Sequence, residues 1–183
     1  MLVTIIVIAV VVLLILWVIS AQRKFVSAEE IVKNAMSQIG VQQSSRWDAL
    51  TALVELIKSY NEHEYKTLRD VLAARSGITA NSTAAQAQAQ EDLLQKAMVQ
   101  VRAISEQYPD LKANALYNKT MDSVNTYENQ VRMSRMVYND SVTKYNRMVR
   151  QFPDSLVASL LHFVEKEYLK ENTAKSDMPS LKI

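Results

Sequence analysis

The chain has 183 residues, enough for one domain with appendages, and its 21 basic and 19 acidic residues give a net charge of +2. This near-balance predicts no basic face, so we expect no nucleic-acid partner. The lack of cysteine excludes disulfide and thiol chemistry, and two glycines are too few for the usual phosphate-binding loops. A composition rich in Ala, Gln, Glu, Lys, Leu and Met instead favours long helices.

The first element is an apolar run from Leu2 to Ile19, LVTIIVIAVVVLLILWVI. As a helix it would rise about 27 Å, close to the roughly 30 Å thickness of a hydrocarbon core. Trp17 suits the membrane interface, and Arg23 and Lys24 follow at once. With no basic residue before the run and no clear cleavage site after it, we expect residues 1–22 to be a retained transmembrane anchor rather than a signal peptide. The positive-inside rule then predicts the N-terminus outside and the domain in the cytoplasm.

The domain is expected to cover residues 23–170. Its first helix is predicted from Ser27, where SAEE has the pattern of a capping box, to about Ser76. Gly77 and the following ITANST are the expected stop and linker.

Within this first helix, the stretch YNEHEY contains His63-Glu64, which is how the zinc-peptidase motif H-E-x-x-H begins. The motif needs a second histidine one turn later, where this chain has Thr67. The metalloprotease hypothesis therefore fails, and we expect neither a metal nor another cofactor.

Three more helices are predicted, over about Ala84 to Gln107, Asn114 to Gln151 and Asp154 to Lys170. Residues 171–183 are polar and aperiodic, so we expect a disordered tail. No segment shows a convincing period-two strand pattern. The predicted fold is all-α: an N-terminal transmembrane helix followed by an elongated antiparallel helical bundle with long, coiled-coil-like helices.

Polar residues interrupt the apolar stripes of the two longest predicted helices. We call this set the polar seam: Arg46, Glu64, Arg75, Glu128, Arg135, Asn139 and Asn146. A catalytic or ligand-binding cluster between helices is one interpretation. We favour the other, in which paired charges fix helix register and subunit pairing. On that interpretation Glu128 and Arg135 should each meet a polar group on a neighbouring helix, with Arg46, Glu64 and Arg75 as the candidates.

Several long motifs resemble the LemA family of bacteria. They are AMSQIGVQQSSRWDALTALVELIKSY, HEYKTL, YPDLKAN, the pattern E-x-x-V-x-x-x-R-x-x-YN-x-x-V-x-x-YN over Glu128 to Asn146, and FPDSLVASLLHF. The resemblance extends from Leu2 to about Leu169, although Gly40 stands where the family usually has an acidic residue. It implies a membrane-anchored antiparallel helical fold with the domain on the cytoplasmic side and no agreed enzymatic activity. Family genes often neighbour that of a membrane zinc metalloprotease, which suggests a link to envelope quality control.

The sequence therefore predicts a non-enzymatic scaffold or interaction protein at the bacterial inner membrane. Its expected partners are the lipid bilayer, further copies of itself and another membrane protein. An enzyme using Glu64, Glu128 and Arg135 stays open as an alternative, as does a ligand- or peptide-binding module with a groove between helices.

Overall fold

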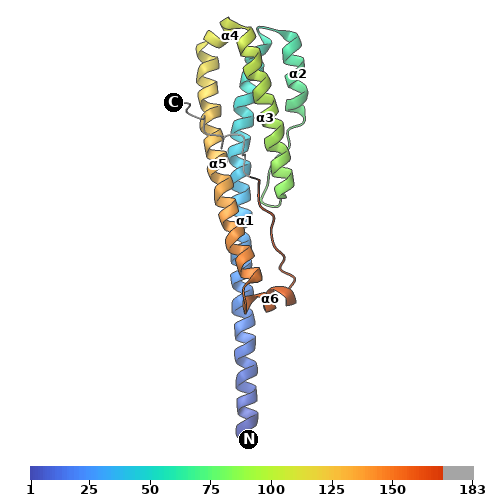
Figure 1. Cartoon of the computed structure of the whole chain (residues 1–183), viewed down its shortest axis with the longest axis vertical. Coiled ribbons are helices and arrows are strands. Elements are labelled where there is room, and N and C mark those ends of the chain that lie inside the picture. The colour runs from blue at the N-terminus through green and yellow to red at the C-terminus, as the bar shows by residue number, and fades with distance from the viewer. Residues whose placement is uncertain (171–183) are drawn as a thin grey trace, which may run out of the picture.

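The computed structural model describes residues 1–170 as an elongated rod of helices, and this part of the chain contains no strand (Figure 1). The helices are α1 (Leu2–Lys58), α2 (Glu62–Ala73), α3 (Ala84–Gln107), α4 (Pro109–Ala113), α5 (Ala115–Arg150) and α6 (Asp154–Leu160). The all-α prediction is confirmed. The tail predicted over residues 171–183 lies outside the described residues.

Helix α1 runs unbroken for 57 residues, about 86 Å, from the apolar N-terminal run into the domain. Its N-terminal part is long and apolar enough to cross a membrane and is bare of packing in the structure (Figure 1). The predicted helix start at Ser27 is wrong, because Ser27 is an exposed residue in the middle of α1. A capping box is useful only where backbone N–H groups lack partners, and the preceding turns of α1 already supply them.

The first predicted helix is also interrupted. Helix α1 ends at Lys58, and α2 begins at Glu62 after Asn61, whose extended backbone lets its side chain accept hydrogen bonds from the N–H groups of His63 and Glu64. Helix α2 then packs back against α1, with Leu68 fully buried. The YNEHEY stretch is therefore a helix break and an N-cap.

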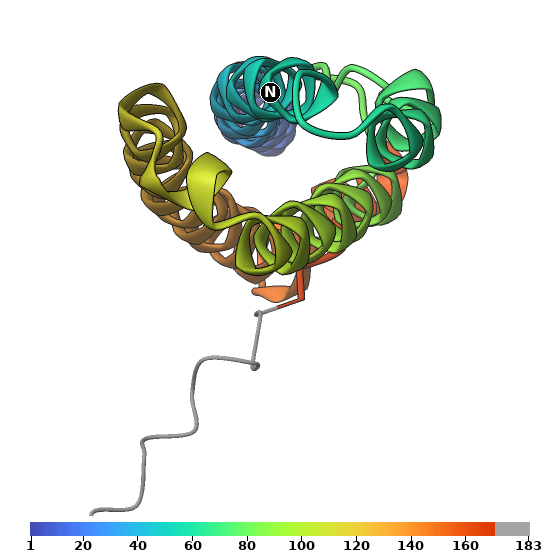
Figure 2. The same ribbon diagram turned by 90° about the horizontal axis from the view of Figure 1, so that it is seen from above.

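The bundle core lies around α1. Seen along the rod, α5, α3 and α2 form an arc with α1 on its concave side (Figure 2). Helices α1 and α5 are antiparallel, since Phe25 of α1 contacts Tyr145 while Arg46, further along α1, contacts Glu128. A membrane-proximal cluster around Phe25 and a distal cluster around Trp47 supply the buried apolar side chains.

The linker between α2 and α3 lies against α1 at Gly40. A Cβ atom at this position would overlap the backbone carbonyl of Ile78, so glycine allows the close approach. Helix α3 then begins where predicted, with Thr83 and Gln86 forming a capping box.

The fourth predicted helix is too long. Helix α6 ends at Leu160, His162 has a φ of 59°, and the chain continues without helix to Lys170. We call residues 163–170 the strap, because this segment runs back along α5. Side chains of α5 supply partners for its backbone groups, which removes the need for helical hydrogen bonds.

Candidate functional site

A buried ionic cluster joins the three longest helices. Arg46 of α1 is 0% exposed, and its guanidinium contacts Glu91 of α3 at 2.8 Å and Glu128 of α5 at 3.6 Å. Gln95 accepts a further hydrogen bond from Arg46 at 3.5 Å, and Gln43 donates one to Glu91 at 3.5 Å. The expected contact between Glu128 and helix α1 is confirmed.

The electrostatics of the cluster favour a fixed helix register. A buried guanidinium is costly unless carboxylates and further hydrogen-bond acceptors surround it. Here one arginine contacts carboxylates on two other helices, and sliding α1 or α3 by one turn would separate the buried Arg46 from the buried Glu91. Glu128 also meets Arg132 on its own helix at 3.8 Å.

The cluster is not fully satisfied. Gln43 Oε1, Arg46 Nε and the indole N–H of Trp47 are buried without a hydrogen-bond partner among the described residues. Each such atom costs about 1–3 kcal/mol. These buried polar atoms distinguish the cluster from a purely apolar core.

Two other seam residues lie away from Arg46. Arg75 lies just after α2, and its guanidinium contacts two residues of α1: Asp48 at 2.7 Å and the hydroxyl of Ser44 at 2.8 Å. Glu64 is half-buried in the first turn of α2. Both positions follow from the fold-back of α2. The predicted single helix, on which Arg46, Glu64 and Arg75 would share one face, is divided into α1 and α2.

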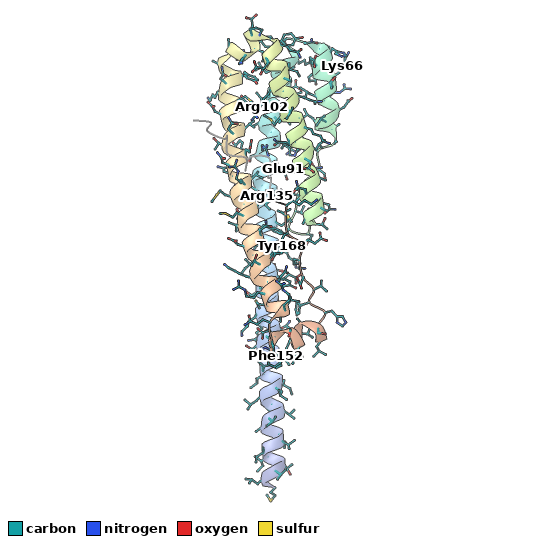
Figure 3. All side chains as sticks on the ribbon, in the orientation of Figure 1. Lys66, Glu91, Arg102, Arg135, Phe152 and Tyr168 are labelled. Carbon is teal, nitrogen blue, oxygen red and sulfur yellow. The ribbon has the colours of Figure 1, made fainter. Side chains whose placement is uncertain are left out.

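Arg135 joins α5 to α3 and to the strap. It donates to the side chain of Gln88 and to the carbonyl of Lys170, both at 2.7 Å. Burial lowers the pKa of its guanidinium, while the nearby carboxylates of Glu91 and Asp92 oppose this shift. Figure 3 shows Arg135 and Glu91 at neighbouring heights in the bundle.

Asn139 and Asn146 bind the strap through its backbone. Asn146 accepts from the N–H of Lys166 at 2.8 Å and donates to its carbonyl at 2.9 Å. Asn139 makes the same pair of bonds with Leu169, at 2.9 and 3.0 Å. Seven helical residues rise about 10.5 Å and three extended residues span about 10 Å, so the two spacings match. We call this arrangement the asparagine clamp.

Side chains reinforce the clamp. Lys166 pairs with Glu29 of α1 at 2.7 Å, and this hydrogen bond lowers the pKa of Glu29. Burial raises the pKa of Tyr138, whose hydroxyl donates to the carbonyl of Glu167. Leu169 enters the membrane-proximal core and is only 3% exposed.

A cavity of about 350 Å³ lies beside the clamp. Its walls come from α1, the linker before α3, Tyr138 of α5 and the strap, and its polar groups include Glu29, Lys33 and Lys166. The cavity lining does not include Arg46, Glu91 or Glu128.

No group of three or more His, Cys, Asp or Glu side chains is placed to hold a metal within residues 1–170. His63 is exposed at the start of α2. At the end of the candidate span, Trp17 is half-buried, and Arg23 and Lys24 are exposed.

Sequence reasoning missed Glu91 and the role of the strap. A signal for Glu91 existed, because the stripe of α3 through Ala97 and Leu94 continues backwards onto Glu91, Ala87 and Ala84, all buried. The sequence of the strap shows no such periodic pattern, because the side chains that bind its backbone lie on α5.

One family model, described as the LemA family, matches residues 35–182. The match includes the ionic cluster, the asparagine clamp and the strap. No curated protein gives a significant match to the chain.

Proposed function

We propose a function for this chain, which belongs to the LemA family. It is a non-enzymatic scaffold of the bacterial cytoplasmic membrane, and it associates with copies of itself. Its domain faces the cytoplasm and serves as an interaction surface for a membrane-protein partner. The family resemblance extends the proposal to envelope quality control.

The closure of the ionic cluster carries this proposal. Arg46 is inaccessible to solvent, and it contacts Glu91, Glu128 and Gln95, so this buried charge ties three helices together. A catalytic arginine needs access to a substrate, and the described cavity is lined by other residues.

An exposed apolar face on α5 supports self-association. Met133, Met136 and Val137 are each about half-exposed and lie on the side of the helix opposite the buried Val131 and Tyr138. Methionine-rich surfaces suit protein contacts because the side chains adapt to a partner. Anchoring in one membrane also raises the effective concentration of neighbouring copies.

The test is photo-cross-linking in intact cells, with a photoreactive amino acid at Met136 and, as control, at the exposed Lys66 of α2. We expect cross-linked dimers of the full chain from position 136 and few from position 66. The paired change Met136→Lys with Val137→Lys should reduce the oligomer seen by mass measurement in detergent, whereas Lys66→Glu on α2 should not. A monomer at micromolar concentration would contradict the proposal.

The asparagine clamp favours a second candidate function, a peptide-binding module. The clamp forms hydrogen bonds with backbone N–H and C=O groups, which every extended peptide carries. An extended segment from another protein could therefore form the same hydrogen bonds once the strap is displaced. Saturable binding of a peptide copy of the strap to full-length protein, lost in Asn139→Ala, would favour this candidate over the scaffold.

An enzyme using Glu64, Glu128 and Arg135 is the third alternative. Mutations in the ionic cluster distinguish it from the scaffold. Alanine at a catalytic residue removes activity and leaves stability equal or better, whereas alanine at a structural charge lowers stability.

A further inference from the structure

Helix α6 lies beside α1 at the level where the candidate span ends. Val157 and Ala158 of α6 belong to the same buried cluster as Ala21 and Phe25 of α1, and Val18 packs partly against it. The apolar run of the span extends to Ile19, so α6 packs against the first turns of α1 beyond the hydrocarbon core. Figure 1 shows α6 at the lower end of the domain, where α1 emerges bare.

The same corner exposes an apolar stripe. Phe152, Leu156 and Leu160 are spaced by four residues and are 74%, 59% and 66% exposed. Leu161 and Val164 add to it. Figure 3 places Phe152 at the end of the domain nearest the candidate span. Single exposed apolar residues are ordinary, whereas five of them within 13 residues favour an interaction surface.

The charges beside this stripe are mostly positive, with Asp154 in the first turn of α6 as an acidic exception. Arg23 and Lys24 are exposed on α1, and Arg147 and Arg150 are exposed in the last turn of α5. Arg150 also lies 3.8 Å from Glu165. Basic residues around apolar side chains at this depth match anionic headgroups over acyl chains.

We propose that the corner of α5 and α6, residues 152–164, is a second membrane contact, with Phe152, Leu156 and Leu160 inserted at the headgroup–acyl boundary of the bilayer that holds α1. The occupant of the exposed stripe is the lipid of that bilayer, preferentially anionic lipid. The contact fixes the tilt of the rod, because α1 and α6 then meet the membrane at two points.

Spin labels on the cysteine-free full-length protein test this. A single cysteine replaces Leu156 in one variant and Leu116 in the other. Leu116 is the control because it is also 59% exposed but lies in the first turn of α5, at the membrane-distal end of the domain. Each labelled protein is placed, one chain per disc, in nanodiscs of phosphatidylcholine with phosphatidylglycerol. Collisions with oxygen, which concentrates in lipid, and with a water-soluble nickel complex are then measured.

At Leu156→Cys we expect the ratio of oxygen to nickel collisions to exceed that at Leu116→Cys severalfold, and to fall when phosphatidylglycerol is omitted. Equal ratios at the two positions would overturn the proposal, because the stripe would then face water. Low collision rates with both reagents would also overturn it, since they would show protein covering the stripe. An unchanged ratio without phosphatidylglycerol would overturn the preference for anionic lipid.

Discussion

At the scale of single residues, Arg46 shows how one charge can set the register of a bundle. Its nearest partner, Glu91, is also buried, whereas the side chains of Arg75 and Asp48 are 34% and 67% exposed. The two arginines therefore offer a matched comparison of a buried and a surface ion pair.

We predict that Arg46→Met destabilises the full-length protein by about 3–5 kcal/mol, because it leaves Glu91 charged and buried without its partner. Arg75→Met should cost only about 0–1 kcal/mol. Denaturant titrations followed by circular dichroism measure both values.

The double variant Arg46→Met with Glu91→Met should recover much of the loss, since residues in one network couple. Additive effects of the two changes would argue against a shared buried pair. Wild-type stability of Arg46→Met would point instead to a functional charge, and the ligand-binding alternative would gain.

At the scale of elements, the strap depends on two asparagines on α5. Asn146 satisfies both backbone groups of Lys166, and these two bonds together are worth about 1–3 kcal/mol. Their loss should release the strap locally before it unfolds the bundle.

We predict that Asn146→Ala lowers the hydrogen-exchange protection of the Lys166 amide about tenfold or more, with a smaller effect on the centre of α5. Asn129→Ala is the control, because Asn129 is an exposed asparagine of the same helix. Unchanged protection in Asn146→Ala would show that the remaining contacts, those of Asn139 and Leu169 among them, hold the strap without Asn146.

The pair between Glu29 and Lys166 makes the strap sensitive to acid. The hydrogen bond from Lys166 lowers the pKa of Glu29 below its ordinary value of 4.5. Because the pKa of Glu29 is lowered, the stabilisation by the Glu29–Lys166 pair is complete at neutral pH. It declines as the pH falls below about 4.5 and is lost once the pH passes the lowered pKa. Because both side chains are partly exposed, this contribution is about 0–1 kcal/mol.

We therefore predict that Glu29→Gln lowers strap protection at pH 7 by up to a few-fold, and that variant and wild type converge as the pH falls below 4.5 and past the lowered pKa of Glu29. Protection factors for the Lys166 and Leu169 amides, corrected for intrinsic exchange, measure this. Glu30→Gln should have no such effect on the strap, since Glu30 pairs with Lys33 on α1. A difference that persists or grows on acidification would contradict the assigned sign.

The elements that the sequence predicts well are those with local causes. Helix α3 begins at a capping box and ends before Pro109, so its bounds follow from neighbouring residues. The strap has no such local cause, because its backbone partners are Asn139 and Asn146 on another helix. The same reason applies to the site: the sequence placed Arg46 and Glu128 among the seam residues, but only the packing of α3 brings Glu91 to Arg46.

At the scale of the whole molecule, the continuity of α1 connects the candidate span and the domain mechanically. Because no linker separates residues 19 and 25, the orientation of the span fixes that of the bundle. The membrane side on which the domain lies therefore determines which partners can reach the exposed face of α5.

Membrane orientation is the last prediction. Arg23 and Lys24 lie next to the C-terminal end of the candidate span, and the positive-inside rule places such residues in the cytoplasm. A single cysteine at Lys66→Cys, far from the membrane at the distal end of the bundle, reports the location of the domain (Figure 3).

We expect a membrane-impermeant maleimide to leave Lys66→Cys unlabelled in intact spheroplasts and to label it fully after permeabilisation. Adding Arg23→Ser and Lys24→Ser, together with Val3→Lys and Thr4→Lys, should make part of the population reactive in intact cells, because the charge bias across the span is then reversed. Efficient labelling of Lys66→Cys in intact spheroplasts, without the charge reversal, would place the domain outside. Self-association and the proposed lipid contact of α6 would then have to take place on the outer surface of that membrane.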